Sequence, residues 1–317
     1  MKLLITGGAG FIGSHIAERY LASGAEITIL DNFSTGNRNN LKKISSTIKI
    51  VDGDIRDSRK VNKIIKWADC VIHMAAALGV ANIMNDTQNS ISTNVIGSEV
   101  VLNAAAKYGK RILIASTSEI YGKNPTQPLT EESDRIIGAP TNIRWSYSDA
   151  KAIEEALATS LFHTQNLRVT TVRFFNTVGP KQSGMYGMVL PRFIESALGN
   201  REIVVYGDGN QSRVFCHVND AVNAVELLLE NDQSVGEVYN VGGVGEISIN
   251  DLAKLCIKMT GSESEIKHIP YEVAYPIGFE DMFRRVPDTK KIKALTGWES
   301  KIEIEEIIQD IVNSRLN

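Results

Sequence analysis

The stretch KLLITGGAGFIGSHIAERYLASGAEITILD, residues 2–31, decides the fold of this chain. Residues 2–6 are a short apolar run without polar alternation, which is typical of a strand buried on both faces of a parallel sheet. Residues 12–23 follow with the apolar periodicity of a helix, and residues 26–30 repeat the strand pattern. Strand, helix and strand in this order predict the first unit of a doubly wound α/β fold.

Three glycines, Gly7, Gly10 and Gly13, separate the first strand from the helix. The first permits a tight turn, the second lets the backbone approach a pyrophosphate, and the third lets helix and strand pack closely. The helix N-terminus then offers free N–H groups and a partial positive charge to the phosphates. Glycines can also recur in a turn that binds nothing, but the strand–helix–strand context favours dinucleotide binding.

Acidic residues follow the second and third strands. Asp31 ends the second strand about 20 residues beyond the glycines, where a carboxylate accepts hydrogen bonds from the adenosine ribose hydroxyls. Asp31 would repel a 2′-phosphate, so we predict NAD as the cofactor, although Arg38 leaves NADP open. A third strand, residues 48–51, precedes Asp54, whose carboxylate either meets an adenine edge or caps the helix that begins near Asp57.

Composition excludes several classes of protein. The chain has 317 residues and a net charge of −3, with 43% hydrophobic and 22% charged residues, so nothing favours nucleic acid or an anionic membrane as a partner. Three dispersed cysteines argue against a disulfide framework, and no two of the five histidines have metal-ligand spacing. Met1 leads directly into a strand and no apolar run approaches ~18 residues, so we expect a soluble cytoplasmic protein without a metal.

Strand and helix patterns alternate up to about residue 175. Residues 70–73 form a strand pattern that runs into three alanines, including Ala75 and Ala76, which would let a cofactor pass close to the backbone. We interpret His73 as a core histidine. A helix predicted at residues 92–108 carries Asn94, a polar group that needs a partner, for which the neighbouring catalytic strand is a candidate.

The candidate catalytic groups follow the fifth strand, residues 112–115. Ser116 to Gly122, STSEIYG, places hydroxyls and a carboxylate at a strand end, where parallel sheets bind ligands. Tyr147 and Lys151 lie four residues apart in a predicted helix, residues 146–162, and therefore point the same way. We predict that these groups form the floor of the substrate site.

Beyond the sixth strand, residues 169–174, the alternation breaks and a second domain is expected. The segments 188–193, 204–217 and 283–288 combine arginines with aromatic residues. Arginines offer forked donors to a diphosphate, and an aromatic ring can pack on a base. Ordinary surface arginines and core aromatic residues would produce the same sequence pattern. We predict a first domain at residues 1–178 and a mainly substrate-binding domain at residues 179–317, with the chain crossing back once.

Taken together, the motifs resemble a known family. TGGAGFIG, the aspartate after the second strand, the hydroxyl run before YG, YxxxK and RFFNxxGP look like those of the extended short-chain dehydrogenase/reductases that modify nucleotide sugars. YGDGNQSR and RRVPD are similar to the nucleotide-binding segments of that family. The resemblance covers essentially the whole chain. It implies a Rossmann-type doubly wound parallel sheet with a smaller mixed α/β carboxy-terminal domain.

The resemblance also implies roles for single residues. Tyr147 would be the acid/base, Lys151 would lower its pKa and hold the nicotinamide ribose, and Thr117 would bind the sugar hydroxyl. Ser118 and Glu119 complete the expected catalytic set. The expected cofactor contacts are Gly7, Gly10, Phe11, Ile12, Gly13, Asp31, Asn32, Ser34, Thr35, Gly36, Asp54, Ile55, Ala75, Ala76, Asn94, Ser116, Tyr147, Lys151 and Phe174. The expected substrate contacts are Thr117, Asn176, Val189, Leu190, Arg192, Tyr206, Arg213, Arg285 and Asp288, with Asn176, Arg213 and Arg285 on the diphosphate.

The reaction that follows oxidation of the sugar separates members of that family. A 4,6-dehydratase carries an acid where this chain has Ser118, which makes dehydration the weakest interpretation. UDP-glucuronate decarboxylases share the Thr-Ser-Glu run but have arginines where this chain has Ala152 and Met188. A UDP-sugar 4-epimerase needs no extra acid, and GMVLPRF, residues 187–193, resembles that of epimerases, so we predict a 4-epimerase of the UDP-glucose type. UDP-glucuronate decarboxylase and UDP-glucuronate 4-epimerase are the alternatives.

Two further expectations concern the class of protein and its assembly. A protein that binds NAD without turnover remains a different possibility, although the intact Thr117, Tyr147 and Lys151 argue against it. The resemblance predicts a homodimer in which the helices around residues 92–108 and 148–163 of each subunit form a four-helix bundle. The sugar is not named by the sequence, because specificity depends on the shape of the pocket.

Overall fold

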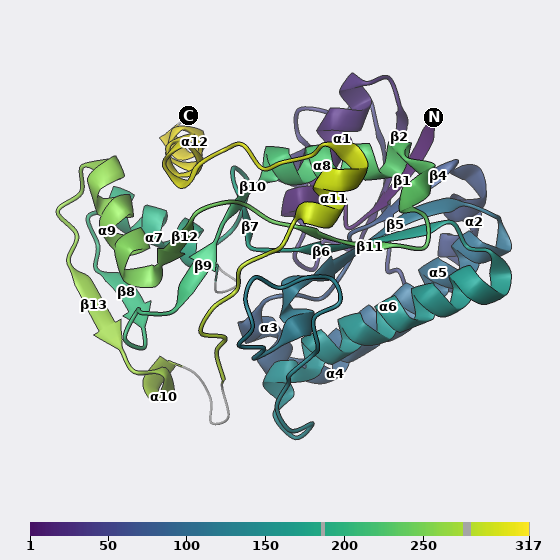
Figure 1. Cartoon of the computed structure of the whole chain (residues 1–317). Helices are drawn as coiled ribbons and strands as arrows, with labels where there is room; N and C mark the ends of the chain where they lie inside the picture. Colours follow the sequence, from purple (N-terminus) through teal and green to yellow (C-terminus); the bar gives the residue numbers. More distant parts are fainter. Residues whose placement is uncertain (185–187, 275–279, 317) are drawn as a thin grey trace.

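The computed structural model of the protein describes residues 1–184, 188–274 and 280–316, so Gly187 of the GMVLPRF segment lies outside the described residues (Figure 1). Its centre is a seven-stranded sheet in the order β11-β6-β5-β4-β1-β2-β3, in which every pair of neighbours is parallel. These strands are β1 (Lys2–Thr6), β2 (Glu26–Asp31), β3 (Lys49–Asp52), β4 (Cys70–His73), β5 (Arg111–Thr117), β6 (Val169–Phe174) and β11 (Val238–Val241). The predicted doubly wound parallel sheet is confirmed.

Helices cover both faces of the sheet. One face carries α1 (Phe11–Ala22) and α8 (Val218–Glu230), with α11 (Lys290–Thr296) packed against β11. The opposite face carries α2 (Ser58–Trp67), α5 (Ser98–Lys107) and α6 (Ser146–Gln165). Because both faces are covered, the central strands are mostly apolar, and every residue of β4 and β5 is buried.

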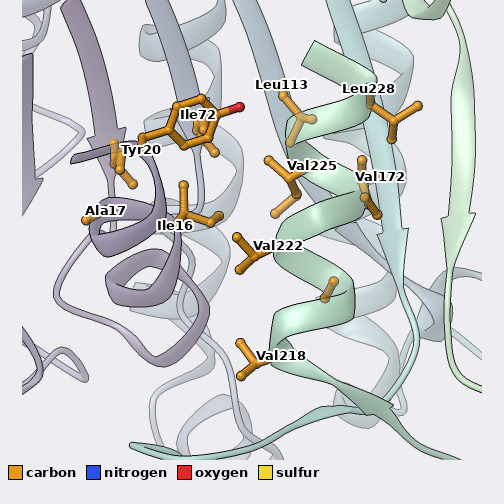
Figure 2. Packing of buried hydrophobic residues seen from close by; sticks show 14 of the residues in the cluster. Ile16, Ala17, Tyr20, Ile72, Leu113, Val172, Val218, Val222, Val225 and Leu228 are labelled. Carbon is orange, nitrogen blue, oxygen red and sulfur yellow. The ribbon is translucent and has the colours of Figure 1, made fainter. Parts of the chain in front are cut away.

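Helices α1 and α8 come from distant parts of the chain and pack side by side. Figure 2 shows Ile16 and Tyr20 of α1 and Val222 and Val225 of α8 converging over the strands, where they meet residues such as Leu113 of β5. Residues 218–241 therefore return to the first sheet after the chain has left it. The strand β11, which the sequence analysis did not predict, extends the sheet beyond β6.

A second apolar cluster lies to one side of the sheet (Figure 1). It is built from α7 (Val189–Leu198), α9 (Ile249–Thr260), α12 (Ile304–Leu316) and the parallel pair β8 (Ile203–Tyr206) and β13 (Ile266–Ile269). Short strands complete this region: β7 (Thr177–Val178), β9 (Ser212–Val214), β10 (Cys216–His217) and β12 (Glu246–Ser248), followed by the short helix α10 (Tyr271–Ala274). The boundary between residues 178 and 179 stays a prediction.

The helix expected at residues 92–108 is not regular. Short helices α3 (Val80–Asn85) and α4 (Thr87–Ile91) precede a wide π turn at Ser92–Gly97, and only then does α5 begin. π turns are frequent where a helix serves a functional site. Of the helices in the described ranges, none has the length and apolar character needed to cross a bilayer.

Leu228→Ala tests whether α8 belongs to the core of the first sheet. Leu228 is fully buried there, so we expect its truncation to lower the free energy of unfolding by about 3 kcal/mol. Leu316→Ala is the matched control, because Leu316 is 72% exposed and its truncation should cost less than about 0.5 kcal/mol. Urea unfolding measures both, and equal losses would contradict the assignment.

Candidate active site

A cavity of about 950 Å³ opens between the carboxyl ends of the sheet strands and the second apolar cluster. The turn after β1, the ends of β2, β4, β5 and β6, and residues of α6, α7 and β8 all line it. Parallel strands bring their carboxyl ends to one edge, so segments far apart in the sequence meet at this cavity.

The glycine turn leaves room only for bare backbone. Gly7 has a φ of +68°, and a Cβ built on it would stand 2.6 Å from the backbone nitrogen of Ala75 on the neighbouring strand end. A Cβ on Gly13 would overlap the carbonyl oxygen of Gly7. Helix α1 begins at Phe11, and the preceding residue, Gly10, has no side chain to cap it. The first N–H groups of α1 thus face the cavity, an arrangement that fits a pyrophosphate.

Asp31 lies at the cavity wall at the end of β2. Its carboxylate accepts hydrogen bonds from the backbone N–H groups of Ala9 (2.9 Å) and Phe33 (2.8 Å). Burial raises the pKa of Asp31, although these two N–H groups act in the opposite direction. Arg38, also at the wall, stacks on the Phe33 ring and donates to Asp52 (2.7 Å). A carboxylate beside an arginine that already has a partner fits a ribose diol better than a 2′-phosphate.

Two predicted cofactor residues lie outside the cavity. Asp54 does not cap the following helix; that cap is Asp57, which accepts from the Lys60 N–H, while Asp54 pairs with Arg56 at 2.6 Å. Asn94 binds the backbone of Ala77 through both ends of its amide (2.7 and 2.9 Å) and not the catalytic strand. Neither side chain lines the cavity; Asn94 acts on it by fixing the loop after β4.

His73 is buried and hydrogen-bonded, as the core interpretation requires. Its ring nitrogens contact the hydroxyls of Thr6 (2.6 Å) and Ser98 (3.1 Å). Burial, together with the nearby charge of Lys151, lowers the pKa of His73 to about 3, so the ring is neutral.

Tyr147, Lys151 and Thr117 come together as predicted from their spacing, and all three line the cavity. The Tyr147 hydroxyl interacts with the Thr117 side chain at the end of β5, and Thr117 Oγ1 also accepts from the backbone N–H of Glu119 (3.1 Å). Burial, followed by the charges of Glu119 and Glu154, raises the pKa of Tyr147. Lys151 Nζ donates to the carbonyl of Ala115 and to Glu154, both at 2.7 Å.

Glu119 is an anion held between two arginines. Arg144 Nη1 lies 2.7 Å from its Oε2, and Arg285 Nη1 lies 3.7 Å from its Oε1. Burial alone would raise the pKa of Glu119, but the two arginines outweigh it and lower this pKa to about 2. Arg285 also donates to Ser118 Oγ (3.2 Å), which places that hydroxyl against a cation.

The predicted substrate residues lie at the cavity, with one exception. Arg213 pairs with Asp281 (2.9 Å), and the Arg192 guanidinium stacks 4.2 Å from the centre of the Tyr206 ring. Asp288 is not at the cavity; it accepts from the Lys290 N–H just before α11. The other predicted substrate residues line the cavity, namely Thr117, Asn176, Val189, Leu190, Arg192, Tyr206, Arg213 and Arg285.

The remaining predicted cofactor residues also line the cavity, namely Gly7, Gly10, Phe11, Ile12, Gly13, Asp31, Asn32, Ser34, Thr35, Gly36, Ile55, Ala75, Ala76, Ser116, Tyr147, Lys151 and Phe174. The sequence analysis missed Arg144, although an arginine three residues before Tyr147, just before the predicted helix, was a usable signal. It also missed Asp281, whose distance from Arg213 along the chain hides the pair.

Comparison with known proteins places the chain among nucleotide-sugar enzymes. Residues 4–311 match the family described as GDP-mannose 4,6 dehydratase. A UDP-N-acetyl-alpha-D-glucosaminuronate decarboxylase of Bacillus cytotoxicus is 40% identical, with 98% of this chain and 96% of the relative covered. UDP-glucuronic acid decarboxylase 1 of Xenopus tropicalis is 33% identical, with 96% of this chain and 70% of the relative covered.

Solved structures share the fold over the whole chain. The UDP-glucose 4-epimerase of Thermotoga maritima with UDP-glucose has a TM-score of 0.89 and 30% identity, covering 100% of this chain and 99% of that one. A dTDP-glucose 4,6-dehydratase of Streptomyces venezuelae, solved with NAD, has a TM-score of 0.90 and 28% identity, covering 100% and 98%. One backbone therefore serves proteins named for different reactions.

Gly7→Ala tests the close approach of the glycine turn to the β4 end. Gly7 and Gly24 both have positive φ, so a Cβ strains the backbone at either position, but only at Gly7 would it displace Ala75. We expect Gly24→Ala to cost about 1 kcal/mol of stability, because its φ is +81°, and to leave NAD binding unchanged. Gly7→Ala should in addition weaken NAD binding at least tenfold in calorimetric titration. Equal NAD affinity in the two variants would contradict the role of the glycine turn in NAD binding.

Proposed function

This chain belongs to the GDP-mannose 4,6 dehydratase family within the extended short-chain dehydrogenase/reductases, and we propose that it is an NAD-dependent decarboxylase of a UDP-hexuronate. It is an enzyme of the epimerase, dehydratase and decarboxylase kind, with NAD as cofactor. The 4-epimerase favoured from the sequence is not favoured by the relatives, which are named as uronate decarboxylases. Their names support the alternative.

The observation that carries the proposal is the buried pair of Arg144 and Glu119 at the cavity wall. Arg144 stands in the turn before α6, and Glu119 directly follows Thr117 and Ser118. A diphosphate can be held by other arginines at the cavity, but a second anionic group on the sugar needs a cation beside the catalytic residues. Arg144 and Arg285 place two cations against the single negative charge of Glu119, so this wall keeps a net positive charge for such a group.

Decarboxylation follows from the chemistry of a 4-keto uronate. Tyr147 takes the proton of the sugar 4-hydroxyl, which Thr117 orients, and bound NAD⁺ supplies the acceptor for the two electrons and the hydrogen of C4. The resulting ketone is β to the carboxylate. When the C5–C6 bond breaks, carbon dioxide leaves and the electron pair passes to the C4 oxygen as an enolate, to which the hydroxyls of Thr117 and Tyr147 can donate. C5 then takes up a proton. Tyr147 would return the proton to the C4 oxygen as C4 regains its hydride from the reduced cofactor, so that the net loss is one carbon dioxide.

Other outcomes of the same ketone have less support. Elimination of water needs an acid. Ser118 provides only a hydroxyl group, which accepts a hydrogen bond from Arg285, and a serine hydroxyl does not act as an acid at neutral pH. A protein that only stores NAD would have no reason to hold Thr117, Tyr147 and Lys151 at one wall. Epimerisation at C4 needs no group that the cavity lacks, so experiment has to separate it from decarboxylation.

Incubation with three sugar nucleotides tests the proposal. We expect UDP-glucuronate or UDP-N-acetylglucosaminuronate to lose the mass of carbon dioxide in mass spectrometry, and UDP-glucose to remain unchanged. Tyr147→Phe is the inactive control that should still bind NAD. A product of unchanged mass with a new anomeric proton signal would overturn decarboxylation in favour of epimerisation.

Arg144→Met tests, in the same assay, whether Arg144 helps to bind the carboxylate of the uronate. Loss of a charged hydrogen bond to the substrate costs about 1.5–3 kcal/mol, so kcat/KM for the uronate should fall roughly 10- to 100-fold. Arg168→Met, which removes a half-exposed arginine paired with Asp232, is the control and should keep the wild-type rate. Equal values of kcat/KM in the two variants would show that Arg144 does not bind the substrate.

We also propose that the protein is a homodimer. Three isoleucines stand exposed on neighbouring helices of one sheet face: Ile91 at the end of α4 (43%), Ile96 in the π turn (49%) and Ile153 on α6 (50%). These helices pack against one another. Exposed apolar residues gathered on packed helices are typical of an interface.

Ile153→Asp should therefore convert the dimer to a monomer in light scattering at micromolar concentration, because burying an unpaired carboxylate in the interface costs free energy. Val273→Asp is the control, since Val273 is exposed on α10, away from the proposed bundle, and should leave the dimer intact. A wild-type protein that is already a monomer would remove the proposal.

A further inference from the structure

Glu154 is a buried carboxylate that the chemistry above does not use. It follows Lys151 by three residues on α6, and the two side chains are 1% and 2% exposed. Glu154 Oε2 accepts from Lys151 Nζ at 2.7 Å. A buried ion pair is costly to form and contributes little stability, so its presence beside a catalytic tyrosine calls for a functional explanation.

The pair determines where the lysine charge lies. Lys151 Nζ has three donors, and two of them are directed to the Ala115 carbonyl and to Glu154, at 2.7 Å each. The third is left for the cavity, which Lys151 lines together with Tyr147. Glu154 therefore holds the Lys151 ammonium in place, and its negative charge partly offsets the effect of the Lys151 charge on Tyr147.

The groups that face this pair come from four elements. His73 of β4 lies 4.0 Å from Glu154 Oε1 but is neutral, so it adds no second cation. Glu155 of α6 is paired with Arg173 of β6, and the Ser98 hydroxyl of α5 is uncharged. Glu119, beyond Thr117, acts on Tyr147 in the same direction as Glu154. Lys151 is thus the cation closest to Glu154 among the described contacts.

We propose that Glu154 is a positioning residue for the Tyr147–Lys151 pair: its carboxylate anchors Lys151 at the base of the nicotinamide-ribose site and tempers the charge that Lys151 presents to Tyr147. The proposal concerns the acid/base pair itself. It therefore does not depend on which step follows oxidation, and it stands or falls separately from decarboxylation.

Burial raises the pKa of Glu154, against the opposing effect of Lys151. With Glu154 ionised, the Tyr147 phenolate faces an additional negative charge and forms at higher pH. Removing that charge while keeping an acceptor for Lys151 should make the phenolate form at lower pH. A residue that only fills space would have no such effect.

Glu154→Gln makes this change, because the amide oxygen can still accept from Lys151. The readout is the phenolate absorbance of the NAD-loaded protein during a pH titration, with the Tyr147→Phe spectrum subtracted to remove the other eight of the nine tyrosines. We expect the Tyr147 transition to move about one unit toward lower pH. Glu99→Gln, which removes a surface charge from α5, is the control and should leave it in place.

Glu154→Asp separates anchoring from charge. The shorter side chain keeps the charge but draws back from Lys151 Nζ, so the Tyr147 transition should stay close to that of the wild type while NAD dissociates at least fivefold faster from the loaded protein. A Tyr147 transition in Glu154→Gln at the wild-type pH would overturn the charge effect. NAD release from Glu154→Asp at the wild-type rate would overturn the anchoring.

Discussion

The hydrogen bond from Lys151 Nζ to the Ala115 carbonyl joins helix α6 to the end of strand β5, and the active site depends on it. A buried ammonium has to find acceptors, so this contact fixes the rotation of α6 about its axis. Tyr147 lies one turn earlier on the same face and is thereby held against Thr117. The parallel register then brings β5 level with the glycine turn after β1, which places the two halves of the chemistry on one edge of the sheet.

A second electrostatic constraint ties the catalytic strand to the rest of the chain. Glu119 follows β5, and its two arginine partners come from before α6 and from the segment before α11. Because burial penalises an isolated charge, each of these segments is held where its arginine can reach the carboxylate. Arg285 retains its proton even though burial and Arg213 lower its pKa to about 10. The cluster is therefore a fixed set of charges at neutral pH.

What the sequence predicts correctly is local. The glycine turn, Asp31 and the Tyr147–Lys151 spacing are each determined within one strand, turn or helix, so their placement at the cavity follows from a few consecutive residues. Most of what it misses depends on distant segments: β11 pairs with β6 after a long excursion, and Asn94 binds Ala77. The pairing of Asp54 with Arg56 is a local miss, since the two residues have a sequence separation of 2. Arg144 is the instructive case, because its position just before the helix could be read from the sequence, whereas its pairing with Glu119 could not.

The backbone fold does not determine which reaction follows the oxidation of the sugar; the side chains at the cavity do. Proteins named as epimerase and dehydratase share this backbone over the whole chain, so the backbone does not select the product. In the roles proposed above, Tyr147 and Lys151 would serve any reaction that begins by removing the 4-hydroxyl proton. In the proposed reaction, the groups that distinguish one fate of the ketone from another would be those next to C5 and C6 of the sugar, and the candidates are the Ser118 hydroxyl against Arg285 and the Glu119 carboxylate against Arg144. A wall that provides cations and no acid can bind an anionic carboxylate but cannot protonate a leaving hydroxyl, and for this reason we propose decarboxylation over the loss of water.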